Sequence, residues 1–340
     1  MSGKDLGEKQ LKLWLMTAMS APLAQAVGGI SWVTVLVTGI ACGGFLFVIR
    51  RIREGISNLP GWLTVLAQIW LVIRLLYMLG EAECCWQADQ SGVFVPLILL
   101  LLGGLSACKG MKAAAGVASI LFYFVAAGYG ATGVASLKNV HDSWMLTGVG
   151  GVQPQLIAIF LLPTVMLLFS EKYRPLGPAW LGGLAGVGGI LGLLINGVLS
   201  AGMAAGYENG FYEMSRSVSY LGSVERIESM TASVLVLGWF AMFSLHFIVL
   251  SEVRETNEKR GSLPVWVMLF AVAALYLSGA KVDALVSVAA DVLLCLFVLL
   301  QRGKDFFKKG LTNRERCDNI CKLSARQHEI TEFRKKIKKF

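Results

Sequence analysis

The chain has 340 residues, of which 55% are hydrophobic and 16% are charged. Soluble domains carry about 25% charged residues, so this composition excludes a soluble globular protein, a disordered protein and a small disulfide framework. The formal net charge is +9, and residues 301–340 hold 13 Lys and Arg against 5 Asp and Glu. The rest of the chain is therefore almost neutral and has the composition of a membrane protein.

Long apolar segments follow one another along most of the chain. A helix needs about 20 mostly apolar residues to cross the ~30 Å hydrocarbon core of a bilayer. Ten such segments predict an all-α polytopic membrane domain over residues 1–300, with spans at about 11–29, 31–49, 61–80, 93–108, 113–137, 145–169, 178–203, 229–250, 264–280 and 284–300. The fourth, ninth and tenth segments are short, which suits tilted helices or helices shielded by their neighbours.

The Lys and Arg residues between the segments predict the orientation, because cytoplasmic loops are richer in them. With the N-terminus in the cytoplasm, 26 of the 31 Lys and Arg face the cytoplasm. Only Lys138, Arg216, Arg226 and Lys281 lie on the opposite side, and Arg74 lies within the third span. We therefore expect both termini in the cytoplasm.

The first segment has a second interpretation. Lysines precede its apolar run, and Ala24-Gln25-Ala26 has the small residues of a signal-peptide cleavage site. The acidic residues Asp5 and Glu8 are unusual before such a site. Cleavage would also leave nine spans and spoil the charge distribution, so we favour a membrane span.

Two of the ten segments contain helix-breaking residues. Ser20–Gly29 in the first segment and Gly148–Gln155 in the sixth each combine a proline, a glutamine and glycines. Proline removes a backbone donor, glycine tolerates non-helical dihedrals, and unwound backbone at membrane depth must be buried in protein or line a cavity. These breaks predict two inverted five-helix repeats, at about 11–137 and 145–300, with a small-molecule site between broken first and sixth helices. Two simple proline kinks remain the alternative.

Unwound backbone offers N–H groups to a carboxylate and carbonyl groups to an ammonium or a metal cation. Side-chain hydroxyls in nearby helices add candidate contacts, although many such hydroxyls bond their own backbone. The candidate ligand-binding residues are Ser20, Ala21, Gln25, Gly28, Tyr77, Gly148, Gly150, Gly151, Gln153 and Thr231. A Gly151→Leu change is expected to fill the unwound segment and abolish the response to ligand.

Ionisable side chains are costly within a membrane and are therefore candidates for gating or ion coupling. These candidates are Arg74, Glu225, Arg226, Glu228 and Asp291. Arg74 has two possible partners, Glu81 and Asp291, and its role is either a structural ion pair or a ligand contact. The lone His246 is expected to pack or to form a hydrogen bond.

The sequence contains no phosphate-binding loop, nucleophile elbow or zinc-protease motif. Its seven cysteines, including the adjacent pair Cys84 and Cys85, match no zinc spacing and are expected to be free thiols. We therefore expect no enzyme, no catalytic residue, no metal and no cofactor. The predicted external loop from Tyr207 to Gly222 is either a solvated connection, which we favour, or a lid.

Three stretches resemble the B-subunit permeases of spore germinant receptors, a branch of the amino acid–polyamine–organocation transporter superfamily. They are Ser20–Ala24 with Gly28–Val33, Ala107–Lys112, and Val224–Ser229 continuing through Trp239. The resemblance covers most of residues 10–300 and implies the ten-helix fold typified by the leucine transporter LeuT. It also implies a subunit that senses a nutrient amino acid or similar small molecule.

The expected partners of such a subunit are a larger A subunit and a lipoprotein C subunit, and its expected location is the spore inner membrane or a cell membrane. One alternative function is a secondary active amino acid transporter coupled to H⁺ or Na⁺. Another is a membrane scaffold without transport. In each case the chain is an integral, multi-pass membrane protein.

Residues 301–340 form a basic tail. Apolar residues recur in it at intervals of three, four and seven, which predicts an amphipathic cytoplasmic helix. Such a helix can bind anionic lipid, each surface Lys or Arg contributing about 1 kcal/mol. A partner-binding helix and a partly disordered orientation signal are the alternatives. No nucleic-acid binding is expected, because the basic stretch is short and no binding module is recognisable.

Overall fold

The computed structural model describes residues 7–53, 61–85, 92–148, 150–151, 153–169, 176–217, 227–255 and 263–300. Contacts divide the chain into two units, Met1–Leu294 and Cys295–Phe340, and the first unit holds every site discussed below. The predicted tail and two gating candidates, Glu225 and Arg226, lie outside the described residues.

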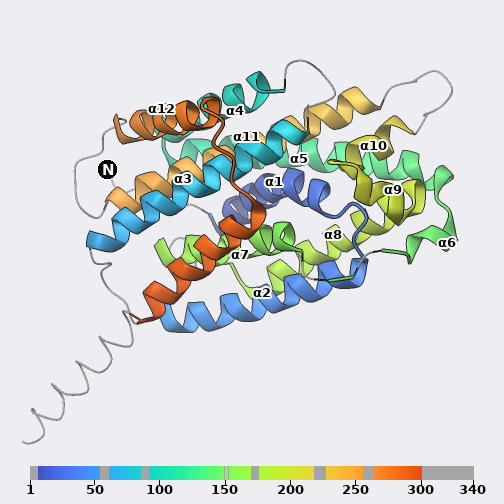
Figure 1. The fold of residues 1–340 in the computed structure, drawn as a ribbon, viewed down its shortest axis with the longest axis horizontal. Coiled ribbons are helices and arrows are strands. Elements are labelled where there is room, and N and C mark those ends of the chain that lie inside the picture. Colours follow the sequence, from blue (N-terminus) through green and yellow to red (C-terminus); the bar gives the residue numbers. More distant parts are fainter. Residues whose placement is uncertain are drawn as a thin grey trace, which may run out of the picture. The chain divides into compact units, whose positions relative to one another are not determined.

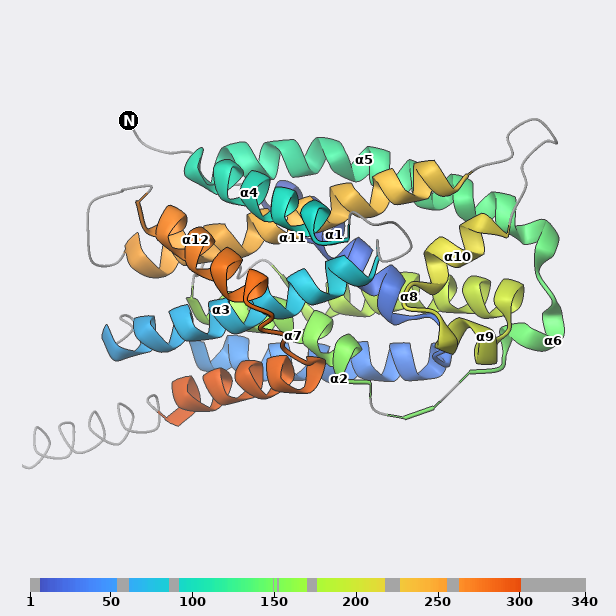
Figure 2. The same cartoon turned by 45° about the horizontal axis from the view of Figure 1, so that its top comes forward.

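Helices make up nearly all of the described part (Figures 1 and 2). In chain order they are α1 (Glu8–Ala26), α2 (Trp32–Arg53), α3 (Gly61–Cys84), α4 (Phe94–Cys108), α5 (Met111–Ser136), the 3-10 helix η1 (Leu137–Asn139), α6 (Asp142–Met145), α7 (Pro154–Phe169), α8 (Pro178–Leu199), α9 (Ala201–Gly206), α10 (Gly210–Arg216), α11 (Glu228–Glu255) and α12 (Leu263–Leu277). A further apolar helix, Ala284–Leu300, follows α12. Each predicted span overlaps a helix of the described part, although the sixth span contains a helix only from Pro154 onward.

Among the described residues, five helices are long and apolar enough to cross a membrane. They are Trp32–Arg51, Val65–Cys84, Met111–Asn139, Pro178–Leu199 and Glu228–Ser251. Four shorter apolar helices accompany them: Phe94–Cys108, Pro154–Phe169, Val265–Leu277 and Ala284–Leu300. The described part is therefore that of an all-helical, polytopic membrane protein.

The outer helices present large apolar side chains away from the core. Ile40 on α2, Phe124 on α5, Ile190 on α8 and Phe270 on α12 are each more than 60% exposed. An apolar surface of this extent is unfavourable in water and is the surface that lipid tails solvate. These helix faces are therefore suited to the hydrocarbon of a bilayer.

Helix α1 lies in the middle of the surrounding helices (Figure 1). It packs against α5, α7, α8 and α11, and Trp14 and Leu15 are fully buried. The polar residues of its first turns keep α1 out of the set of five apolar spanning helices. A helix enclosed by other helices does not need a continuous apolar surface toward lipid, which explains this composition.

The predicted break within the first helix is wrong. Helix α1 continues through Pro22 to Ala26, and the turn Val27–Gly29 then leads into α2. Pro22 supplies no N–H to the carbonyl of Ala18, but the helix retains its path. Gly29 has φ of +73°, a left-handed conformation that favours glycine. The helix-breaking glycines therefore end α1 rather than interrupt it.

The sixth predicted segment, 145–169, contains a helix only from Pro154 onward, so the described residues show the start of a helix and not a break within one. The short helix α6 ends at Met145 and α7 begins at Pro154, with no helix at the described residues between them. Gly151 in this connection has φ of +131°. Proline at the first position of α7 fits a helix start, because the N–H that it lacks has no partner within the helix.

The predicted solvated loop from Tyr207 to Gly222 contains a helix, α10, that packs on the bundle. The preference for a solvated connection is therefore wrong for this part of the segment. Two short helices, α9 and α10, together span Ala201–Arg216 and both pack against α8, and we call them the α9–α10 hairpin. Asn209 accepts a hydrogen bond from the Tyr212 N–H at 3.0 Å and so caps α10. Phe211 and Met214 are fully buried, and the Phe211 ring lies 4.7 Å from that of Tyr129 on α5.

Candidate functional site

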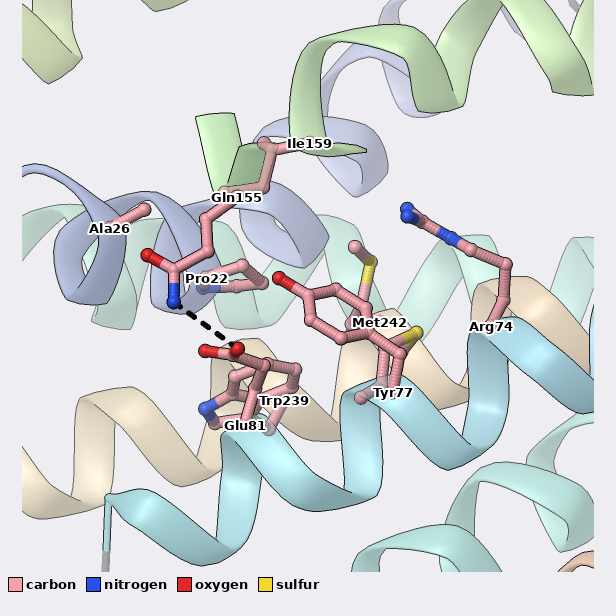
Figure 3. Close-up of a pocket in the computed structure, with 10 residues that line it drawn as sticks. Pro22, Ala26, Arg74, Tyr77, Glu81, Gln155, Ile159, Trp239 and Met242 are labelled. Atoms are coloured by element: carbon pink, nitrogen blue, oxygen red, sulfur yellow. Dashed lines mark hydrogen bonds between the residues drawn. The ribbon is translucent and has the colours of Figure 1, made fainter. Parts of the chain in front are cut away.

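Four helices, α1, α3, α7 and α11, meet around a narrow internal pocket (Figure 3). Pairs of these helices lie far apart in the sequence, so the pocket exists only in the folded bundle. The lining residues are Pro22, Ala26, Arg74, Tyr77, Met78, Glu81, Gln155, Ile159, Trp239 and Met242.

Glu81 supplies a carboxyl group to this pocket. One oxygen accepts a hydrogen bond from the Gln155 amide of α7 at 3.3 Å, and the other accepts one from the Gln25 amide of α1 at 3.0 Å. The Gln25 amide also donates to the backbone carbonyl of Glu81 at 3.0 Å. No Lys, Arg or His of the described part forms an ion pair with Glu81. The pocket therefore contains a carboxyl group that neutral amides hold in place.

Aromatic side chains stand beside this carboxyl group. Tyr77 lies one turn before Glu81 on α3, and Figure 3 shows its hydroxyl pointing toward Pro22 and Gln155. Trp239 enters from α11, and its indole N–H makes no hydrogen bond to any described residue. The same holds for the Nε–H of Arg74. The Trp239 and Arg74 N–H groups are therefore two buried donors, and a ligand oxygen or a water can accept from them.

Arg74 is only 1% exposed, and it joins three helices. Its guanidinium donates to Ser287 Oγ at 2.8 Å, to Asp291 Oδ2 at 3.4 Å and to the Ala158 carbonyl of α7 at 3.0 Å. Asp291 also accepts a 2.6 Å hydrogen bond from the Trp70 indole. Because Asp291 neutralises Arg74, the charge left without a counter-ion in the pocket is that of an ionised Glu81.

The arrangement is suited to a protonated amine. A carboxylate attracts an ammonium, and the Trp239 ring can add a cation–π attraction of about 0.5–2 kcal/mol. The Tyr77 ring already has a cation beside it, because the Arg74 guanidinium carbon lies 5.8 Å from the ring centroid. The thioethers of Met78 and Met242 provide polarisable apolar walls. Among the described residues, no group of three His, Cys, Asp or Glu side chains is arranged to hold a metal ion.

Three of the predicted site residues lie at or beside this pocket. Tyr77 and Arg74 line the pocket, and Gln25 donates a hydrogen bond to Glu81, which also lines it. Asp291 is the partner of Arg74, so the structure decides between the two acidic partners considered above. His246 is buried and stacks on Trp70 at 6.0 Å, consistent with packing.

Several other predicted ligand contacts instead hold helices together. The Ser20 carbonyl accepts from the Tyr129 hydroxyl at 3.1 Å, and Ala21 packs where Gly238 of α11 approaches α1. Thr231 lies 3.2 Å from Thr132 of α5, hydroxyl to hydroxyl. Gly28 lies against Gly210 of the α9–α10 hairpin.

The predicted contacts before α7 do not line the pocket either. Gly148 lies against the backbone of Ile30 and Ser31. Gly150 and Gly151 are exposed, and a side chain at either would meet nothing within 4 Å. A leucine at Gly151 would therefore extend into open space and would not fill a binding site. The backbone carbonyl of Gln153 accepts the first hydrogen bond of α7.

The gating candidate Glu228 is at the start of α11 and pairs with Arg216 at 3.4 Å. No disulfide joins the five described cysteines, which are Cys42, Cys84, Cys85, Cys108 and Cys295.

Of the ten residues that line the pocket, only Arg74 and Tyr77 are among the predicted site residues, and the eight others include Glu81, Gln155, Trp239 and Met242. Glu81 was considered only as a partner for Arg74, although an acidic residue near the end of an apolar span is itself a signal. No family model matches this sequence, and no curated protein shows significant similarity to it. The function of the pocket is therefore inferred from its own side chains.

Proposed function

We propose that the chain is a ten-span membrane protein that binds a small amine-bearing molecule, such as an amino acid, in the pocket between α1, α3, α7 and α11. The observation that carries this proposal is the Glu81 carboxyl group, which has aromatic neighbours and no cationic partner among the described residues. An ionisable side chain within a membrane bundle is energetically costly, and such residues commonly mark functional sites. In this proposal, binding of the molecule lets the protein sense a nutrient.

The helix contacts support an inverted repeat of five helices. In this scheme α1 to α5 correspond, in order, to α7, α8, α11, α12 and helix Ala284–Leu300. α3 packs on α4 as α11 packs on α12, and α4 packs on α11 as α12 packs on α3. Likewise α1 packs on α8 as α7 packs on α2. Recurrence of the same pairs is what a pseudo-two-fold axis in the membrane plane produces.

The sensing role also draws on the resemblance to the B-subunit permeases of spore germinant receptors. We propose that both termini face the cytoplasm and that the basic tail binds anionic lipid of the inner leaflet. The partners in this proposal are a larger A subunit and a lipoprotein C subunit. The membrane is the spore inner membrane or a cell membrane.

Ligand binding to the purified full-length chain in lipid nanodiscs tests the proposal. Each proteinogenic amino acid is added separately, and the midpoint of thermal unfolding is measured. A ligand at about 100 times its Kd stabilises the folded state by about 2.7 kcal/mol. We expect at least one amino acid to raise the midpoint.

Glu81→Gln is the variant for this test, and Glu83→Gln is its matched control. Glu83 also lies on α3, but it contacts Tyr276 and Lys281 rather than the pocket. Loss of a charge-assisted hydrogen bond predicts binding about 10- to 100-fold weaker in Glu81→Gln, with Glu83→Gln unchanged. Equal affinity in Glu81→Gln and the native chain would contradict the proposed role of Glu81.

A second function, amino acid transport coupled to H⁺, is favoured by the same carboxyl group, because carboxyl groups buried in membrane bundles serve as proton relays. Uptake of a radiolabelled ligand into proteoliposomes with an imposed pH gradient distinguishes the two functions. Accumulation that depends on the gradient and is lost in Glu81→Gln supports transport. Ligand binding without accumulation supports sensing.

A further inference from the structure

The α9–α10 hairpin lies directly on the turn that joins α1 to α2. A Cβ atom added at Gly29 would come within 2.6 Å of Ala205, and one added at Gly28 would come within 3.3 Å of the Gly210 Cα. The backbone of the hairpin therefore touches the backbone of this turn. Glycine at both positions permits this approach, which accounts for the glycine pair in the first predicted segment.

A hydrogen-bond chain runs from the hairpin into the pocket. The Asn209 amide donates to the Cys85 sulfur at 3.3 Å, and the Cys85 thiol donates to the Gln25 side-chain oxygen at 3.0 Å. The Gln25 amide then donates to the Glu81 carboxyl group at 3.0 Å. Asn209, Cys85 and Gln25 are each less than 9% exposed, so water competes little for these bonds. We call this the Asn209–Glu81 chain.

Three members of the chain, Asn209, Gln25 and Glu81, are each positioned by a further contact. Asn209 uses its side-chain oxygen to cap α10, so a shift of its amide group would weaken the cap of that helix. Gln25 also donates to the backbone carbonyl of Glu81, and Glu81 also accepts from Gln155. A buried thiol keeps its proton near neutral pH and can act both as donor and as acceptor, as it does here.

We propose that the Asn209–Glu81 chain couples the docking of the α9–α10 hairpin, which we call the lid, to the state of the Glu81 carboxyl group. Cys85 and Gln25 are the positioning residues of this coupling. The inference rests on the proposed function of the pocket. When a ligand ammonium binds Glu81, it competes with the Gln25 amide, Gln25 no longer holds the Cys85 thiol in place, and the lid loses a contact at Asn209.

Hydrogen exchange of the backbone amides in residues 201–217 measures the docking of the lid. The experiment uses the full-length chain in nanodiscs without ligand. Cys85→Ala removes both hydrogen bonds of the thiol, whereas Cys85→Ser keeps a donor and an acceptor. We expect exchange about tenfold faster in Cys85→Ala, since two buried hydrogen bonds are lost. Cys85→Ser is expected to remain within about twofold of the native rate.

Three further variants sharpen the test. Cys42→Ala is the matched control, because Cys42 is buried in α2 and its thiol forms no hydrogen bond with the described residues. Gln25→Met preserves size and removes the central amide. It replaces Cys85→Ala if that variant fails to fold, and the same acceleration of exchange is expected. Glu81→Ala should accelerate exchange about threefold only, because Gln25 retains the backbone carbonyl of Glu81.

Two results would overturn the proposal. The first is equal acceleration in Cys85→Ser and Cys85→Ala, which would attribute the effect to packing rather than hydrogen bonding. The second is a native exchange rate in Glu81→Ala, which would show that the carboxyl group does not influence the lid. Because no ligand is present, either result leaves the amino acid binding test unaffected, and the lid can be coupled to Glu81 even if no amino acid binds.

Discussion

Arg74 is almost fully buried, and an isolated guanidinium at that depth would be very costly. Glu81 lies seven residues further along the same helix, about 10 Å along its axis. Asp291 belongs to another helix, and its carboxylate lies 3.4 Å from the guanidinium. Helix geometry therefore favours Asp291 as the partner and leaves Glu81 available to the pocket.

Breaking the Arg74–Asp291 pair should destabilise the fold. Asp291→Asn removes the negative charge, so Arg74 becomes a buried charge without compensation. We expect the free energy of unfolding to fall by about 3–5 kcal/mol, as for other broken buried pairs. Detergent-induced unfolding of the purified chain, followed by circular dichroism, measures this change.

The double variant Arg74→Met, Asp291→Leu is the control for this prediction. It removes both charges and keeps apolar volume, so it should lose less stability than Asp291→Asn. A double variant as unstable as the single one would mean that the uncompensated charge is not the cause.

Residues of this kind differ in how far sequence alone reveals them. Arg74 and Asp291 are conspicuous because they are ionisable within apolar runs, and the sequence alone marks both as candidates. Trp239 and Met242 are ordinary residues of an apolar helix. Their place in the pocket depends on the convergence of α1, α3, α7 and α11, which no local pattern encodes.

At the scale of helices, close packing of α1 on α11 depends on Gly238. A Cβ atom added there would lie 2.7 Å from the Ala21 Cβ and 3.1 Å from the Ala21 backbone nitrogen. Gly238→Ala should therefore force the two helices apart and lower the free energy of unfolding by about 1–3 kcal/mol. The midpoint of thermal unfolding in nanodiscs reports this change.

Gly186→Ala is the matched substitution for Gly238→Ala. Gly186 also lies within a long helix, α8, but a Cβ atom there would meet nothing within 4 Å. Its replacement by alanine should leave stability unchanged or raise it slightly. Similar losses in both variants would indicate a general intolerance of alanine rather than a specific helix contact.

Helices were the best-predicted feature, because an apolar run of spanning length has few alternatives in a polytopic protein. Their ends were predicted less well. Pro22, Gly28 and Gly29 suit either a break within a helix or the end of one, and only the docking of the α9–α10 hairpin on this turn distinguishes the two. The sequence predicts a loop where α10 lies, because its apolar residues, Phe211 and Met214, are too few to form a clear pattern.

At the scale of the whole molecule, charge and apolar surface describe the same membrane arrangement. Large apolar side chains are exposed on the outer helices, where lipid solvates them. The distribution of Lys and Arg along the sequence predicts which connections between the spans face the cytoplasm. Helix α5 is suited to test this orientation, because basic residues lie at both of its ends: Lys109 just before it and Lys138 just after it.

Labelling of Lys109→Cys and Lys138→Cys with a membrane-impermeant maleimide measures the orientation of α5. Each substitution is made in a chain whose native cysteines are replaced by serine. The helix has 26 residues, and its ends are about 39 Å apart, enough to lie on opposite faces of a bilayer. In intact cells we expect labelling of Lys138→Cys alone, and of both variants after permeabilisation. Labelling of Lys109→Cys alone would reverse the proposed topology, whereas labelling of both in intact cells would mean that α5 does not span the membrane.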